Sequence, residues 1–303
     1  MLVRAIVQLL LSFALAPLLV GIVNRVKSLF AGRVGPPLLQ PYHDLLKLLR
    51  KGAVYSRTTT WVFRAGPVVA LAAVITAALL LPIAGAPAPV FFTGDFILLA
   101  YLLALARFVT ALAALDTGSS FEGMGAAREV TFSSLAEPAL FLSMLVLARA
   151  TGATSLSGML GGALPGAWTA AGPALLIAVI VLFVVALAEN SRVPVDDPNT
   201  HLELTMIHEV MVLDHGGPDL ALILYGASLK LFLFGALIVQ VAAGAALRGG
   251  WGDLAVFAGG MVGFALAVGT VESLMARLKL TRVPQMLVGA TVLSAFALVL
   301  LVR

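Results

Sequence analysis

The stretch Ala188–Gly217 is a dense group of titratable residues in an otherwise apolar chain. It holds six of the fifteen carboxylates and three of the four histidines, and its one basic residue is Arg192. Carboxylates and imidazoles are the side chains that most often bind and release protons in proteins. The stretch therefore predicts a role in charge or proton handling. Its acidic and histidine residues are Glu189, Asp196, Asp197, Glu203, Glu209, Asp214, His201, His208 and His215.

Four further charged residues stand inside long apolar runs: Arg107, Glu137, Lys230 and Glu272. A charge at the centre of a membrane helix costs at least about 2.5–3.5 kcal/mol, so such residues face a protein interior or a water-filled cavity. Two interpretations are open. The charges are either static ion pairs, such as Arg107 with Glu137, or a chain of titratable groups for proton passage. Glu272 also lies close enough to a helix end for its carboxylate to reach the interface.

The three histidines of the stretch recur every seven residues, so they share one helix face if the helix is continuous. Seven residues rise about 10 Å along a helix, which is too far for two of them to bind one metal ion. No HExxH motif is present. Surface contacts or proton relay are the roles left for them, and we expect no catalytic, cofactor-binding or metal-binding residue in this chain. Asp197 before Pro198 is typical of a helix N-cap.

The elements that carry these residues are membrane helices. The 303 residues are 61% hydrophobic and 11% charged, whereas a soluble domain carries roughly 25% charged residues. Several apolar runs reach the roughly 20 residues that span a bilayer as a helix. We predict an all-α polytopic membrane protein, with residues 1–303 as a single membrane domain and short cytoplasmic amphipathic helices. About eight transmembrane helices are expected, at 2–24, 65–83, 95–115, 131–150, 173–188, 218–243, 254–275 and 284–302.

The distribution of Lys and Arg predicts the orientation in the membrane. The segments 25–64, 116–130, 189–217 and 276–283 hold thirteen of these residues, and the opposite ends hold four. Positive charge marks the cytoplasmic side, so these four segments are expected to be cytoplasmic loops. Both termini then face outward from a cell inner membrane. The net charge of +4 is explained in the same way, without a nucleic-acid partner.

The loops differ in character. Tyr42–Lys51 has leucines at helical spacing between charged residues, which predicts a basic amphipathic helix at the interface. Its Lys47, Arg50 and Lys51 either anchor it to lipid or dock a cytoplasmic partner. The segment 116–130 is rich in small residues and is expected to be a loop, and 84–94, 151–172 and 244–253 are expected to be plain connectors. The chain has no cysteine, so it cannot hold a cysteine-ligated iron–sulfur cluster.

With these residues in view, the chain resembles a known family. The run AENSRVPVDDPNTHLEL resembles the loop signature AETNRAPFDLPEAESEL of the subunit 1 family of respiratory complex I. The segment ARLKLTRVPQ at Ala276–Gln285, the eight helices and the long first loop agree with it. The departures at Val195, Asp197 and the following THLELTMIHE make it more similar to the membrane-anchor subunit of group 4 NiFe hydrogenases, of the formate hydrogenlyase and hydrogenase-4 type. Matching positions are Ala188, Glu189, Arg192, Pro194, Asp196, Pro198, Glu203 and Leu204.

This resemblance implies a non-catalytic membrane subunit that seats a soluble redox arm and links electron transfer to proton or sodium translocation. The NiFe centre and iron–sulfur clusters are then expected on partners: the hydrogenase large and small subunits and an iron–sulfur subunit, with antiporter-like membrane subunits as neighbours. By matching position, Glu189, Arg192, Asp196 and Glu203 form a polar funnel beneath that arm. A quinone-binding subunit of an NADH-dehydrogenase-like enzyme and a stand-alone transporter are the alternatives. The candidates for partner docking are Lys47, Arg50, Lys51, Asp197, His201, His208 and Glu209.

Overall fold

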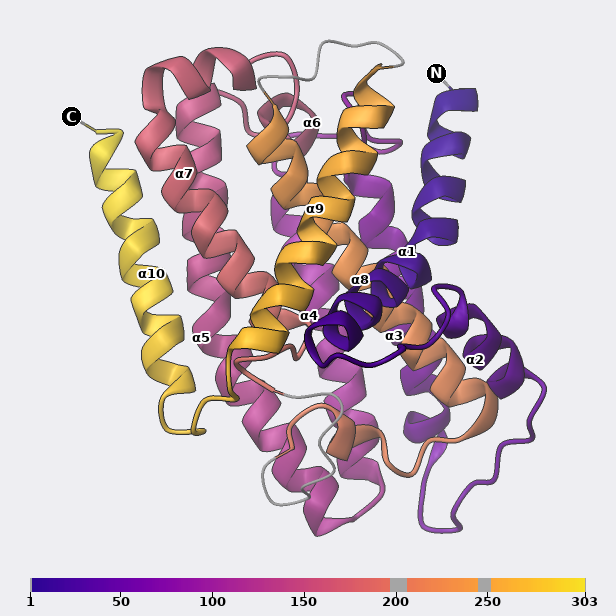
Figure 1. Ribbon diagram of the computed structural model, residues 1–303. Helices are drawn as coiled ribbons and strands as arrows, with labels where there is room; N and C mark the ends of the chain where they lie inside the picture. The colour runs from indigo at the N-terminus through magenta and orange to yellow at the C-terminus, as the bar shows by residue number, and fades with distance from the viewer. Residues whose placement is uncertain (1, 197–205, 245–251, 303) are drawn as a thin grey trace.

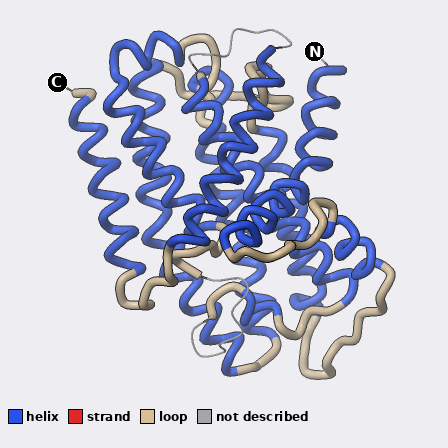
Figure 2. Tube along the Cα trace, in the orientation of Figure 1, coloured by secondary structure: helices blue, strands red, loops and turns tan. Residues whose placement is uncertain are grey.

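The computed structural model describes residues 2–196, 206–244 and 252–302, and this part of the chain is helices joined by loops (Figure 2). The all-α prediction is confirmed. Three of the predicted site residues, Asp197, His201 and Glu203, lie outside the described residues. The helices are α1 (Leu2–Phe30), α2 (Gln40–Leu49), α3 (Trp61–Leu80), α4 (Asp95–Asp116), α5 (Ser120–Thr151), α6 (Leu156–Met159), α7 (Leu164–Glu189), the 3-10 helix η1 (Glu209–Val212), α8 (Gly217–Ala243), α9 (Gly252–Leu274) and α10 (Val283–Leu300).

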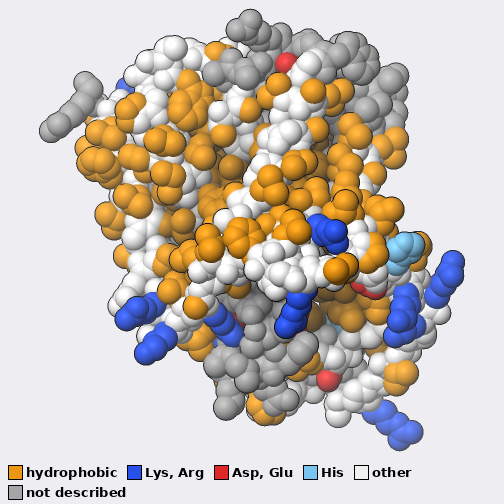
Figure 3. All heavy atoms as spheres, viewed as in Figure 1, with side chains coloured by type: hydrophobic (Ala, Val, Ile, Leu, Met, Phe, Trp, Pro, Cys, Tyr) orange, Lys and Arg blue, Asp and Glu red, His pale blue; other side chains and the backbone are white. Residues whose placement is uncertain are grey.

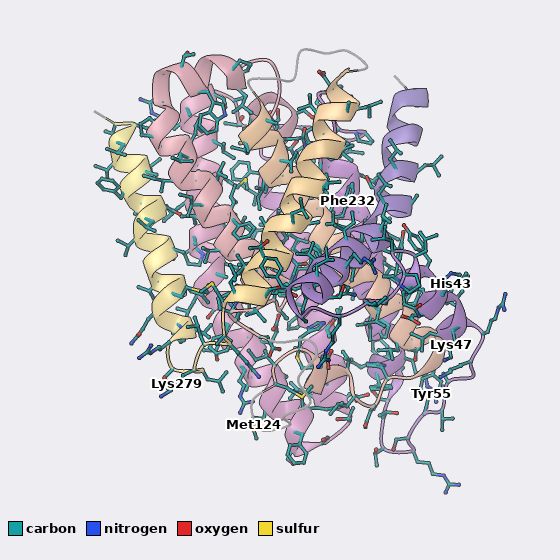
Figure 4. The ribbon with its side chains drawn as sticks, viewed as in Figure 1. His43, Lys47, Tyr55, Met124, Phe232 and Lys279 are labelled. Atoms are coloured by element: carbon teal, nitrogen blue, oxygen red, sulfur yellow. The ribbon has the colours of Figure 1, made fainter. Side chains whose placement is uncertain are left out.

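Eight of these helices are long and apolar enough to cross a membrane, as predicted: α1, α3, α4, α5, α7, α8, α9 and α10. Helix α8 is the most enclosed, with 78% of its most apolar window buried. Helices α1, α3, α7 and α9 pack against it, and Phe232 marks its middle in Figure 4. A charge on the inner part of α8 must therefore find its partner inside the protein.

Three predicted boundaries are wrong, and one of them is the end of α1, which extends to Phe30 instead of residue 24. The segment 116–130 is helical from Ser120, and α7 begins at Leu164 and contains a break at Ala171 instead of starting at Pro173. Gly125 does not make a turn. A side chain there would meet Val210, with its Cβ 2.3 Å from Val210 Cγ1, so the glycine permits close packing of α5 against η1. The predicted connector 151–172 likewise contains α6 and the first turns of α7.

The two ends of the chain lie at the same end of the bundle (Figure 1). In the view of Figure 3, hydrophobic side chains cover the upper and middle parts, and Lys and Arg gather toward the opposite, lower end. This lower end carries α2, the start of α5 and the loop between α9 and α10. The charge separation agrees with the sequence pattern, and which side is cytoplasmic stays a prediction.

Helix α1 contains Pro17, which lacks the N–H that would bond to the carbonyl of Phe13. Tyr225 of α8 donates to this free carbonyl at 3.1 Å. The hydroxyl of Tyr42, from α2, donates to the next carbonyl, that of Ala14. The amphipathic helix predicted at 42–51 is confirmed as α2, and this contact fixes it against the bend of α1 at the lower end of the bundle (Figure 1).

Candidate functional site

Helix α7 ends in a turn that directs the chain beneath the bundle. Ser191 has a left-handed backbone with φ of 50°. The N–H of Arg192 donates to Leu187 O at 2.8 Å, and that of Ser191 donates to Ala188 O at 3.2 Å. These two bonds are those of a Schellman motif, which satisfies the last carbonyls of a helix. The turn leaves Glu189 inside the bundle and brings Arg192 out to face a different pair of helices.

A chain of four charges of alternating sign crosses four helices, and we name it the inner ion-pair chain. Arg107 of α4 lies 2.7 Å from Glu137 of α5 and 2.5 Å from Glu189 of α7. Lys230 of α8 lies 3.0 Å from the other oxygen of Glu189. The side chain of Glu189 is 3% exposed, whereas that of Glu137 is 41% exposed. The chain therefore runs from the interior of the protein to its surface.

The sequence places three of these residues, Arg107, Glu137 and Lys230, inside membrane helices, and assigns Glu189 to the polar stretch. The ion pair between Arg107 and Glu137 is confirmed. The link through Glu189 to Lys230 was not predicted, because Glu189 was read as part of the polar loop. Since buried charges need opposite charges nearby, the two cations on α4 and α8 stabilise the one carboxylate that both reach.

A second group of charges joins α1, α9 and the loop after α7. The carboxylate of Glu272 lies 2.9 Å from Lys27 and 3.2 Å from Arg192, and its side chain is fully buried. The two cations hold Glu272 inside the protein, and its depth relative to the membrane interface stays a prediction. Lys27 belongs to a region that we had treated only as a loop. Its position on the last turn of α1 became apparent only when the helix proved longer than expected.

Asp196 binds backbone and side-chain groups of segments that follow it in the chain. One oxygen accepts the backbone N–H groups of Ile207 and His208, each at 3.1 Å, and the other lies 2.8 Å from Arg277. Arg128 of α5 also donates to Met206 O at 3.0 Å. These bonds fix the backbone at 206–208 from two sides. Asp196 is 2% exposed. It therefore has a structural role in holding this backbone, in addition to the predicted role in the polar funnel.

Two cavities lie beside these charges. The smaller, of about 80 Å³, is lined by the inner ion-pair chain residues Arg107, Glu189 and Lys230, together with Glu129 and His208. The larger, of about 520 Å³, lies among α1, α2, α8 and the loop after α7. Its walls combine apolar residues with a polar set: Asn24, Asp44, Asn190, Ser191, Arg192, Asp196, His208, Glu209, His215 and Ser228. Both cavities are roomy and polar enough to hold water.

Glu129 is a candidate residue that sequence reasoning missed. It is 8% exposed and lies against the smaller cavity, although we had assigned it to a loop. A signal was available. Glu129 precedes Glu137 by eight residues, so both lie on roughly one face of a helix once the segment is recognised as helical.

The described histidines of the polar stretch do not share a continuous helix, because only the four residues of η1 are helical between them. His208 is partly buried, and burial together with the nearby Lys230 lowers its pKa to about 4. His215 is 5% exposed and stacks on Phe63 with ring centroids 3.9 Å apart. Burial lowers the pKa of His215 as well. Both imidazoles are therefore neutral at pH 7.

The remaining docking candidates lie at the lower end of the bundle. Lys47, Arg50 and Lys51 are exposed on α2 and just beyond it, and Figure 4 shows Lys47 at the outer edge of the protein near His43. Glu209 is partly buried and faces the larger cavity. Within the described residues, no group of three or more histidine, aspartate or glutamate side chains could hold a metal ion.

The chain is similar to known proteins over most of its length. The family described as "NADH dehydrogenase" matches residues 3–303. Formate hydrogenlyase subunit 4 of Escherichia coli strain K12 is 32% identical over 292 residues, which is 92% of each chain. Hydrogenase-4 component C of the same organism is 35% identical over 240 residues, covering 78% of this chain and 74% of that one.

A solved structure has the same fold. It is that of the membrane-bound sulfane sulfur reductase, an archaeal respiratory membrane complex, and one of its chains matches with a TM-score of 0.82 over 99% of both chains. The sequence identity to that chain is 22%, so this likeness concerns the fold alone.

Proposed function

The chain belongs to the NADH dehydrogenase family, and from this premise we propose that it is the membrane-anchor and ion-coupling subunit of a membrane-bound NiFe hydrogenase complex. It is a multi-pass membrane protein with eight candidate spans. The relatives named as formate hydrogenlyase and hydrogenase-4 components support the hydrogenase branch of the family, since they are 32% and 35% identical. Its task is to seat a soluble redox arm and to link electron transfer to proton or sodium translocation.

The observation that carries the coupling role is the inner ion-pair chain. Glu189 lies between two cations, and Glu129 lies beside them in a cavity of about 80 Å³. A change of charge at one member alters the electrostatic energy of its neighbours strongly, because the side chains of Arg107, Glu189 and Lys230 are mostly buried. Such a chain can transmit a change of protonation at the mouth of the bundle to Glu137 at its surface.

The redox chemistry belongs to the partners. The NiFe centre and the iron–sulfur clusters reside on the hydrogenase large and small subunits and on an iron–sulfur subunit. Antiporter-like membrane subunits lie beside this chain in the bilayer. The basic end of the bundle, with α2, faces the cytoplasm and receives the soluble arm, so both termini face outward from the cell inner membrane.

Replacement of Glu129 by Gln tests the coupling role, because Gln keeps the shape of the side chain and removes its charge. The complex is purified or studied in everted membrane vesicles, and proton uptake is measured with an acridine dye during hydrogen evolution. We expect proton uptake per hydrogen formed to fall at least about tenfold. Asp253→Asn is the matched control and keeps the wild-type ratio. Asp253 is a buried acid, 4% exposed, in the first turn of α9, and α9 begins at the opposite end of the bundle (Figure 1).

The same preparation tests the assignment to a hydrogenase. A tag on this chain retrieves nickel- and iron-containing subunits in mild detergent, in amounts equal to the tagged chain. Recovery of this chain without nickel-containing partners contradicts the proposed complex. Wild-type proton uptake in Glu129→Gln contradicts the coupling role.

A quinone-binding subunit is the second candidate, and the cavity of about 520 Å³ favours it. Its volume falls within the range of roughly 300–1,000 Å³ that small-molecule sites occupy, and its walls combine apolar residues with polar groups that could orient a quinone. Extraction of the purified complex with organic solvent decides between the two. Stoichiometric quinone, together with quinone-dependent turnover, supports the second candidate, and its absence supports the first.

A further inference from the structure

The smaller and the larger cavity share part of their walls, and this shared wall lies between the inner ion-pair chain and the larger cavity. The larger cavity reaches α2 and Asp44, whereas the smaller one reaches Lys230 and Glu129. A proton that passes from the first to the second must cross the shared wall. Its residues are Asn190, Ser191, His208, Ile223 and Ala227.

Among the described residues of this wall, His208 is the one whose side chain can both bind and release a proton through its ring nitrogens. Ile223 and Ala227 are apolar, and the amide of Asn190 donates to Ala186 O at 2.7 Å. The hydroxyl of Ser191 can bond to water, but it does not bind a proton in this pH range. A neutral imidazole has one nitrogen that donates and one that accepts, so it can face water on both sides at once.

The backbone of His208 is held in place independently of its side chain. Its N–H donates to Asp196 at 3.1 Å, and its carbonyl accepts the N–H of Met211 at 3.1 Å. Because Asp196 is in turn paired with Arg277, the ring is carried by a fixed support. Asp196 is therefore buried where it can hold the backbone of His208 and pair with Arg277.

The titratable and charged groups that line the two cavities differ. The smaller cavity is lined by Lys230 of α8, Glu129 of α5, Glu189 of α7 and Arg107 of α4. The larger cavity is lined by Asp44 of α2, Arg192, Asp196, Glu209 and His215. Burial and Lys230 lower the pKa of His208 to about 4, so a lasting imidazolium is disfavoured at pH 7.

We propose that His208 is the proton-transfer group between the two cavities, accepting a proton from water in the larger cavity and releasing one to water beside Glu129 and Glu189. One ring nitrogen binds the arriving proton while the other gives up the proton that it held. The ring ends neutral as the opposite tautomer, and rotation restores the first. This inference rests on the proposed coupling function and adds the route by which protons reach the inner ion-pair chain.

The test uses the whole complex in everted membrane vesicles, with proton uptake measured per hydrogen formed. His208→Gln keeps a polar side chain of similar length but cannot bind a proton, and we expect the ratio to fall at least about tenfold. His43→Gln is the matched control, since His43 is exposed on α2. It keeps the wild-type ratio.

Chemical rescue separates proton transfer from a structural role. His208→Ala opens space at a wall of the larger cavity, and added imidazole is expected to restore proton uptake in this variant and not in His208→Gln. A wild-type ratio in His208→Gln, or a failure of imidazole to restore uptake in His208→Ala, overturns the inference. If Glu129→Gln loses proton uptake while His208→Gln keeps it, the coupling function stands and only the role of His208 fails. Absence of proton uptake by the wild-type complex overturns both.

Discussion

At the scale of single residues, the protein holds several charges away from water by giving each one a partner. Glu189 contacts both Arg107 and Lys230, and Glu272 contacts both Lys27 and Arg192. Loss of one member of a buried pair typically costs about 3–5 kcal/mol, because the other charge is left without a partner. This interdependence makes the site sensitive to the protonation state of any one carboxylate.

His208 is expected to make stability depend on pH. Its pKa is about 4 in the folded protein and about 6.5 in an unfolded chain. Between these values the unfolded chain binds more protons, so the free energy of unfolding is at its full value above about pH 6.5 and falls as the pH drops toward 4. The loss amounts to roughly 3 kcal/mol. Unfolding in detergent, followed by tryptophan fluorescence from pH 4 to 7.5, measures it.

The variant His208→Gln serves as the comparison. Because His215 and the carboxylates are present in both proteins, the difference between the two pH profiles isolates His208. A wild-type slope equal to that of the variant contradicts the buried, neutral state of this imidazole.

At the scale of helices, close packing of α1 on α9 positions the charges of the second group. Gly269 of α9 lies where a Cβ would be 2.7 Å from Val26 Cβ and 3.2 Å from Val23 O. Small residues of this kind allow membrane helices to approach closely. The approach brings Lys27 within 2.9 Å of Glu272, three residues beyond the glycine.

We expect Gly269→Leu to separate α1 from α9 and to break the ion pair of Lys27 with Glu272. The added side chain collides with Val26 and backbone that cannot move aside, and overpacking of this kind costs about 1–3 kcal/mol. Gly263→Leu, on the same helix, is the control, because nothing lies within 4 Å of its added Cβ. A lower melting temperature for Gly269→Leu than for Gly263→Leu supports the packing, and equal values contradict it.

At the scale of the whole molecule, the lower end of the bundle presents positive charge on two separate sides. Lys47 lies at one edge and Lys279 at the other in Figure 4. The larger cavity opens beside α2, which has no buried residue of its own. Helix α2 contacts α1 through Tyr42 and also packs against α8. Its exposed basic residues can bind either lipid headgroups or a partner protein.

Neutralisation of this helix by the combined changes Lys47→Gln, Arg50→Gln and Lys51→Gln distinguishes the two roles. If the soluble arm docks there, less of the nickel-containing subunit co-purifies with the tagged chain, and the loss grows with salt because exposed charges are screened. Lys279→Gln with Arg282→Gln is the control at the other edge, where both residues are exposed. Unchanged yield of the complex in the first variant supports the lipid-anchor role.

Much of the fold was predictable, and the exceptions have particular causes. The eight spans follow from apolar length, but 116–130 was read as a loop because glycines favour turns in isolation. Packing of Gly125 against Val210 overrides that preference. The ion pair of Arg107 with Glu137, which was one of two open interpretations, is present in the structure. Glu129 was missed because its segment was assigned to a loop, and Arg277 was missed because its partner Asp196 is distant in the chain.

The amino-acid sequence by itself determined that this chain is a bundle of membrane helices, which family it belongs to, and which charged residues stand within long apolar helices. These are local properties, since the transfer of apolar and charged residues into lipid depends mainly on composition over about 20 residues. Only the tertiary structure decided that Glu189 bridges Arg107 and Lys230, that Lys27 meets Glu272, and that His208 stands between two cavities. Ion pairs and cavities arise where helices remote in sequence come together, and that geometry is fixed by packing.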